Sequence, residues 1–233
     1  AYHLIVLLSI AVMTGLARPR QSGFQARLLV SGAALAMGRG ALIAGAFISH
    51  QAGSVSTTWL PLLERCIDVA SLGLLAWAFA PPLGRWRWGG HVFGAINTTL
   101  AIVMCALFAA RWYAGSSPRL AFNGSPQDIA WTGWGVVLAA IGLAASVASL
   151  RATDNPPPSN ESAPPVGYAL AAFIFILGGY LLQLAWPDRE VAASGWTRLA
   201  FVVAFPLFSL SSYQAALPGS LPLDLSRQAA RSV

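Results

Sequence analysis

Long apolar stretches dominate this sequence and limit the folds that it can adopt. A helix needs about 20 predominantly apolar residues to cross the hydrocarbon core of a bilayer. Seven such stretches, the first of them short, alternate with polar or Pro/Gly-rich loops: Tyr2–Leu16, Leu28–Ile48, Leu60–Phe79, Val92–Trp112, Ile129–Leu150, Val166–Trp186 and Trp196–Leu217. The pattern predicts an all-α membrane protein, with a seven-transmembrane helix bundle over residues 1–217 and a cytoplasmic tail or linker over residues 218–233.

The composition excludes an ordinary soluble domain. Charged residues make up 9% of the chain and hydrophobic residues 56%, whereas soluble domains carry about 25% charged residues. All 14 basic residues are arginine, so no lysine is present to form a retinal Schiff base. The net charge of +6 comes from arginines scattered among loops, which argues against a nucleic-acid partner. Cys66 and Cys105 lie in apolar stretches, which predicts small buried side chains rather than a disulfide or a metal site.

The arginines also predict how the chain crosses the membrane. Cytoplasmic loops carry an excess of basic residues, and here one side of the predicted bundle holds eight arginines and the other four. The larger group consists of Arg18, Arg20, Arg27, Arg85, Arg87, Arg151, Arg227 and Arg231, and the smaller of Arg111, Arg119, Arg189 and Arg198. With seven spans, this asymmetry predicts an N-terminus outside and a C-terminus in the cytoplasm.

The third stretch carries three charged residues within a turn and a half. Glu64 and Asp68 are four positions apart and share one helix face, with Arg65 beside them. Ionisable groups inside a membrane usually face protein or water, and Arg39 lies near the middle of the preceding stretch. We expect Arg39 to pair with Asp68. The four residues are then either an ion-pair cluster that fixes helix register or a polar pocket that binds a ligand or senses protons, with contact to lipid headgroups as a further alternative.

The sequence predicts no catalytic site. His3, His50 and His91 do not have metal-ligand spacing, and the chain has no haem-attachment motif and no intramembrane protease arrangement. No cofactor is therefore predicted, although bound lipid or pigment remains open. Pro206, inside the seventh stretch, is a candidate position for a helix kink.

The segment LPLLERCIDVASLGLLAWAF resembles an L-P-x-L-E-R-x-x-D motif. That motif is associated with the seven-transmembrane N-terminal sensor regions of bacterial histidine kinases and GAF-containing signalling proteins of filamentous green bacteria. The matching residues are Leu60, Pro61, Leu63, Glu64, Arg65 and Asp68. The resemblance covers the whole chain in topology and about 20 residues in motif. It implies a multi-pass location in the bacterial cytoplasmic (inner) membrane and a sensory role.

Three functions are compatible with these patterns. The first is a receptor-like domain that relays a signal through the seventh span to a cytoplasmic signalling module, alone or as a homodimer. In that role Arg39 and Arg65 would hold an anion or the carboxylates, and Glu64 and Asp68 would bind a cation or titrate. The second is a non-catalytic accessory or structural subunit of a larger respiratory or photosynthetic membrane complex. The third, a small transporter, is disfavoured because the chain has no evident internal repeat.

Overall fold

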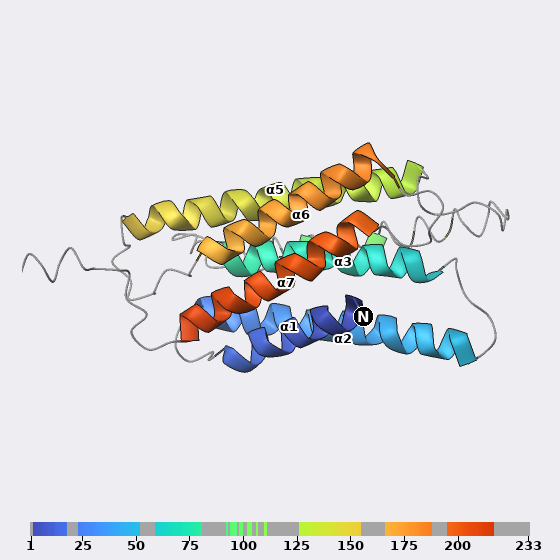
Figure 1. The fold of residues 1–233 in the computed structure, drawn as a ribbon, viewed down its shortest axis with the longest axis horizontal. Helices are drawn as coiled ribbons and strands as arrows, with labels where there is room; N and C mark the ends of the chain where they lie inside the picture. Colours follow the sequence, from blue (N-terminus) through green and yellow to red (C-terminus); the bar gives the residue numbers. More distant parts are fainter. Residues whose placement is uncertain are drawn as a thin grey trace, which may run out of the picture.

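The computed structural model describes residues 2–17, 23–51, 59–80, 126–154, 166–187 and 195–216, together with single positions between 92 and 110. The long segments form helices and no strands (Figure 1): α1 (Tyr2–Leu16), α2 (Gly23–Gln51), α3 (Trp59–Phe79), α5 (Pro126–Asp154), α6 (Gly167–Ala185) and α7 (Gly195–Ala216). The positions described between 92 and 110 are helical as well. The predicted all-α class is therefore confirmed for the part of the chain that the structure describes.

Six of the seven predicted stretches coincide with these helices to within a few residues. The fourth, Val92–Trp112, lies largely outside the described residues. Among the described helices, four are suited by length and composition to cross a membrane: α2, α6, α7 and, within α5, residues Asp128–Arg151. Of the other two, α1 has only 15 residues, and α3 is long enough but contains Glu64, Arg65 and Asp68.

The six helices form a closed ring. Each one packs chiefly against two others, in the order α1, α2, α3, α5, α6, α7 and back to α1. Neighbours in the ring are antiparallel except at two places. α1 runs parallel to α7. Arg198, near the start of α7, lies over the ring of Tyr2 at the start of α1, and further along both helices Ser209 donates a hydrogen bond of 2.8 Å to the Ser9 carbonyl.

The second parallel pair is α3 with α5. Arg65, in the first half of α3, contacts Asp128 in the first turn of α5. At the other end, Ser149 donates a hydrogen bond of 3.1 Å to the carbonyl of Phe79, the last residue of α3. Figure 1 shows both helices running in the same direction along the bundle. The last residue of α3 and the first turn of α5 therefore lie at opposite ends of the bundle.

Aromatic rings fill one half of the interior. The rings of Phe24, Phe79, Phe173 and Phe208, from α2, α3, α6 and α7, form contacts with centroids 5.1–6.4 Å apart. Glycines on α5 make room for aromatic rings of α6. A Cβ atom at Gly142 would overlap the Phe173 ring, and one at Gly135 would overlap the Tyr180 ring. Both pairs are spaced by seven residues, so one face of each helix meets the other along two turns.

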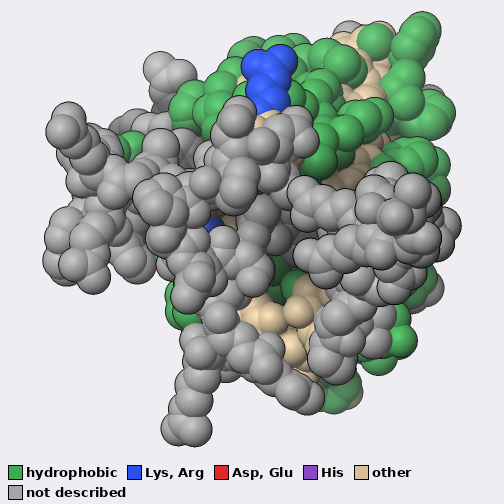
Figure 2. Space-filling view, turned by 90° about the vertical axis from the view of Figure 1, so that its left-hand side faces the viewer, with side chains coloured by type: hydrophobic (Ala, Val, Ile, Leu, Met, Phe, Trp, Pro, Cys, Tyr) green, Lys and Arg blue, Asp and Glu red, His purple; other side chains and the backbone are tan. Residues whose placement is uncertain are grey.

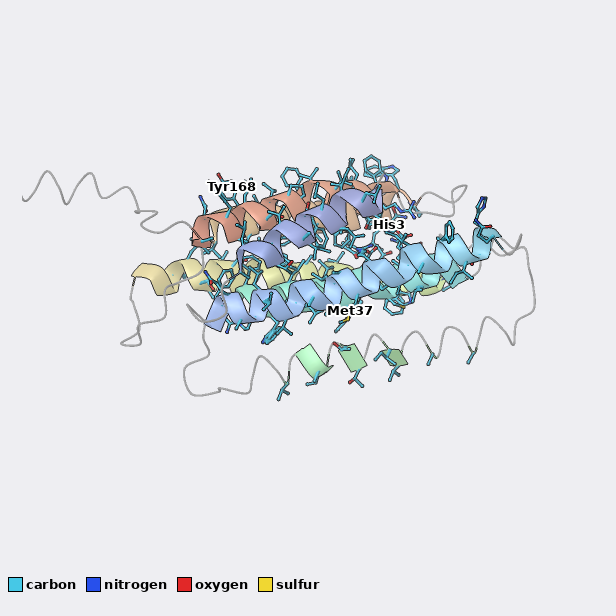
Figure 3. All side chains as sticks on the ribbon, turned by 90° about the horizontal axis from the view of Figure 1, so that it is seen from below. His3, Met37 and Tyr168 are labelled. Carbon is cyan, nitrogen blue, oxygen red and sulfur yellow. The ribbon has the colours of Figure 1, made fainter. Side chains whose placement is uncertain are left out.

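The outer surface of the bundle is apolar. Exposed side chains such as Leu4, Leu8, Met37 and Phe47 cover its sides. Figure 3 shows the helical pieces between residues 92 and 110 outside the ring, on the side of α2 that carries Met37. Figure 2 views the end at which α3, α5 and α7 finish, and on its described surface arginine side chains are visible but acidic ones are not. The three buried carboxylates of the next section lie toward the opposite end.

Candidate functional site

The three charged residues of α3 are all buried and each pairs with a different helix. Glu64, Arg65 and Asp68 are 8%, 5% and 1% exposed. Their partners are Arg198 on α7, Asp128 on α5 and Arg39 on α2, respectively. A charge taken out of water is stabilised only when a partner and hydrogen bonds compensate for its lost hydration. Ion pairs therefore join α3 to three other helices.

Arg39 occupies the centre of this group. Its Nη2 atom donates a hydrogen bond to Asp68 Oδ1 in a short ion pair, and the side chain has no exposed surface. The guanidinium carbon lies 5.4 Å from the centroid of the Tyr2 ring and 5.6 Å from that of Phe201. Two rings, from α1 and α7, thus contribute cation–π contacts to the same charge. Four helices meet at Arg39.

Two further pairs connect α3 with α7 and α5. Arg198 donates through Nε and Nη2 to the two Glu64 oxygens, at 2.7 and 2.6 Å, which is the bidentate geometry of a strong charge-assisted pair. Arg65 lies 3.2 Å from Asp128 and also donates a hydrogen bond of 2.9 Å to Thr197. Arg65 therefore connects α5 and α7 with α3.

The positive and negative charges of these ion pairs are equal in number. Three arginines face three carboxylates within the described helices: Arg39, Arg65 and Arg198 against Glu64, Asp68 and Asp128. We call these six residues the charge cluster. Its Arg198 side chain is the most accessible member, at 35% exposed, whereas the Arg39 and Asp68 side chains are almost completely buried. The cluster is therefore open to its surroundings on the α7 side.

The structure brings the four predicted site residues together. Arg39, Glu64, Arg65 and Asp68 all belong to the charge cluster, and Arg39 pairs with Asp68. Their predicted role in binding a ligand remains a prediction. Pro206 is exposed and lies inside α7, which stays helical to Ala216, and its predicted kink also remains a prediction.

Sequence reasoning missed the partners on α5, α7 and α1. Asp128 precedes the predicted stretch Ile129–Leu150, but α5 begins at Pro126, and the carboxylate lies in the first helical turn. In the sequence, Arg198 contributes only to the smaller group of arginines that predicts the orientation. The sequence did hold a signal: Glu64 and Arg198 lie a few residues inside helices that enter the bundle from the same end. Tyr2 and Phe201 carried no such signal, because an aromatic residue in an apolar helix fits any packed position.

At Cys66 the expected burial is confirmed, but the expectation that it forms no disulfide is wrong. This residue, next to Arg65 on α3, is 7% exposed and disulfide-bonded. The sequence contains one other cysteine, Cys105, which lies outside the described residues. Because small apolar side chains and half-cystines are buried equally well, position in an apolar stretch did not distinguish them. In the described part of the chain, His, Cys, Asp and Glu side chains form no group of three that would suit a metal ion.

Comparison with known proteins gives no relative. No protein-family model, curated protein or solved structure matches the chain.

Proposed function

We propose that the chain is a seven-transmembrane domain of a bacterial cytoplasmic membrane, with its N-terminus outside. The parallel packing of α3 and α5 supports this topology, because the intervening chain has to recross the bundle, and the described positions between 92 and 110 are helical. Arg151, exposed near the end of α5, supports the orientation, since this end of the bundle is the one expected in the cytoplasm. The charge cluster then lies in the outer half of the bilayer.

Within this topology the domain acts as a sensor that relays a signal to a cytoplasmic output partner. The observation that carries the proposal is the double connection between α3 and α7, through Glu64–Arg198 and Arg65–Thr197. A stimulus that rearranges these contacts changes how α7 is held, and α7 is the last described helix before the predicted cytoplasmic tail. A stimulus shifts such an equilibrium only as far as it favours one arrangement over the other. The proposal assigns the cluster no catalytic role.

The second candidate is a non-catalytic accessory subunit of a larger membrane complex. It is favoured by the charge balance of the cluster, because each of the three carboxylates is paired with an arginine of another helix, and these pairs join four helices. In that case the ion pairs fix helix register only, and the apolar outer surface contacts other subunits as well as lipid.

Purification from native membranes under mild conditions distinguishes the two candidates. The associated polypeptides are identified by mass spectrometry. A sensor should be recovered alone or with signalling modules, and its output should change in Glu64→Gln and Asp68→Asn variants that still fold. Arg151→Gln, which alters an exposed arginine at the end of α5 away from the cluster, is the matched control and should leave output unchanged. Stoichiometric recovery with redox or photosynthetic subunits would overturn the sensory proposal.

A further inference from the structure

Beside the charge cluster lies a set of buried polar atoms that have no hydrogen-bond partner within the described part of the chain. The atoms belong to side chains that are at most 2% exposed: Arg39 Nε and Nη1, Asp68 Oδ2, Thr132 Oγ1, the Tyr180 hydroxyl, and both Gln183 amide atoms. Buried polar groups in folded proteins are nearly always hydrogen-bonded, so several orphans on neighbouring helices require an explanation.

The packing of α5 against α6 places three of these residues at one level. The Tyr180 ring lies against Gly135. In antiparallel helices, Thr132, three residues before Gly135, then lies opposite Gln183, three residues after Tyr180. Residues three apart share a helix face, so both side chains lie on the faces that bring α5 and α6 together. The unsatisfied hydroxyls and the unsatisfied amide thus belong to one interface.

The same level contains the Arg39–Asp68 pair. Tyr180 contacts the ring of Phe201, with centroids 6.3 Å apart, and Phe201 in turn lies against the Arg39 guanidinium. On α5, Thr132 is one turn beyond Asp128, whose partner Arg65 lies one turn before Asp68 on α3. The orphan atoms of α2, α3, α5 and α6 therefore lie at one level of the ring, on either side of Phe201.

We propose that this region binds a small uncharged molecule that carries hydroxyl or amide groups. The molecule must both donate and accept hydrogen bonds, because the orphan set contains donors on Arg39, an acceptor on Asp68, and groups of both kinds on Thr132, Tyr180 and Gln183. It must be uncharged, because the six charges beside it already cancel. An added ion would be left without a counterion in an interior of low dielectric.

The inference rests on the proposed sensory function and specifies the chemical class of its stimulus. Gln183, Tyr180 and Thr132 become ligand-contacting residues, while the three ion pairs are the elements that respond. A ligand held between α6 and the Arg39–Asp68 pair contacts the same arginine that joins α1, α2, α3 and α7. Ligand binding and the arrangement of the charge cluster are then coupled through Arg39.

Three isosteric probes test the charge and hydrogen-bonding requirements directly: acetamide, acetate and acetamidinium. The full chain is purified in detergent, and its unfolding temperature is measured against the concentration of each probe. Saturation-transfer NMR on the probe methyl group reports contact independently. Acetamide should raise the unfolding temperature in a saturable manner and receive saturation, whereas acetate and acetamidinium should do neither.

Variants locate the site. Gln183→Met and Tyr180→Phe keep shape but remove orphan groups, and each should weaken acetamide binding at least tenfold. Ser146→Ala is the control, because the Ser146 hydroxyl is buried on α5 but already donates to the Gly142 carbonyl. If Gln183→Met fails to fold, acetamide binding to Tyr180→Phe alone tests whether the orphan groups form the site.

Three results would overturn the inference: no effect of acetamide, which would leave internal water as the occupant; equal effects of all three probes; or undiminished binding in both variants. Because binding is measured without any output partner, these results are distinguishable from failure of the sensory proposal. A chain that binds acetamide but purifies within a redox complex would contradict only the latter.

Discussion

At the scale of single residues, Arg39 shows how a full charge is held in an apolar bundle. Its guanidinium is enclosed by Asp68 from α3 and by the rings of Tyr2 and Phe201 from α1 and α7. The surrounding groups replace water as the partners of the charge. Removing either Arg39 or Asp68 leaves the charge of the other buried without a partner, which costs more free energy of unfolding than removing both.

Asp68→Asn should therefore lower the free energy of unfolding by about 3–5 kcal/mol, the usual loss when one member of a buried ion pair is removed. The double variant Arg39→Met with Asp68→Leu should recover most of that loss, because no charge is left unpaired. Unfolding in detergent by a denaturing surfactant is the measurement, with Arg151→Gln as the control. A double variant that is less stable than Asp68→Asn would contradict this account of the pair.

Cys66 gives a second test at the same scale. Because it is disulfide-bonded, unfolded but unreduced protein should take up no N-ethylmaleimide at this residue, and full modification should follow reduction. Peptide mass spectrometry measures both states. An adduct at Cys66 before reduction would show that the thiol is free.

At the scale of elements, the packing of α5 against α6 depends on glycines, which leave room for aromatic rings of the neighbouring helix. Gly142→Ala should destabilise the bundle by about 1–3 kcal/mol, the usual cost of overpacking, because the new methyl group would overlap the Phe173 ring. Gly133→Ala on the same helix meets nothing within 4 Å and should be neutral or stabilising, by up to about 1 kcal/mol through helix propensity. Thermal unfolding compares the two. Equal effects of the two substitutions would contradict the packing described for α5.

The helix ends show what could and could not be predicted from the sequence. The bounds of α1 were predicted correctly because its apolar run ends at polar residues. α2 begins five residues earlier than predicted, since Gln25 and Arg27 interrupt the apolar pattern. In the structure these side chains donate to the carbonyls of Ala215 and Ala80, at the ends of α7 and α3. In the sequence such polar residues suggest a loop, because their hydrogen-bond partners belong to helices that are distant along the chain.

The charge cluster was predictable only in part for a similar reason. Arg39 and Asp68 were expected to pair because they lie on consecutive antiparallel helices. Asp128 pairs with α3 because the ring places α5 next to it, whereas Arg198 reaches Glu64 from α7, which is not a ring neighbour of α3. The orphan residues Thr132, Tyr180 and Gln183 gave no signal in the sequence, because isolated polar residues in apolar helices are common and their relation depends on the register of α5 against α6.

At the scale of the whole molecule, the proposed topology predicts which loops face the cytoplasm. Alkaline phosphatase fused after residue 55, between α2 and α3, should be active because this loop is expected outside. The same enzyme fused after residue 87 should be inactive, because that loop carries Arg85 and Arg87 and is expected inside. Green fluorescent protein fusions at the same points serve as the reciprocal control. Activity at both positions would exclude the proposed orientation.

The most direct test of the central claim, that the charges of α3 hold α7, is a double-mutant cycle on Glu64 and Arg198. The free energy of unfolding is measured for the wild type, Glu64→Gln, Arg198→Gln and the combined variant. The bidentate pair predicts non-additive effects, with an interaction energy of about 0.5–3 kcal/mol in favour of the pair. Effects that simply add would show that Glu64 and Arg198 do not interact, and α3 would then not hold α7 through this ion pair.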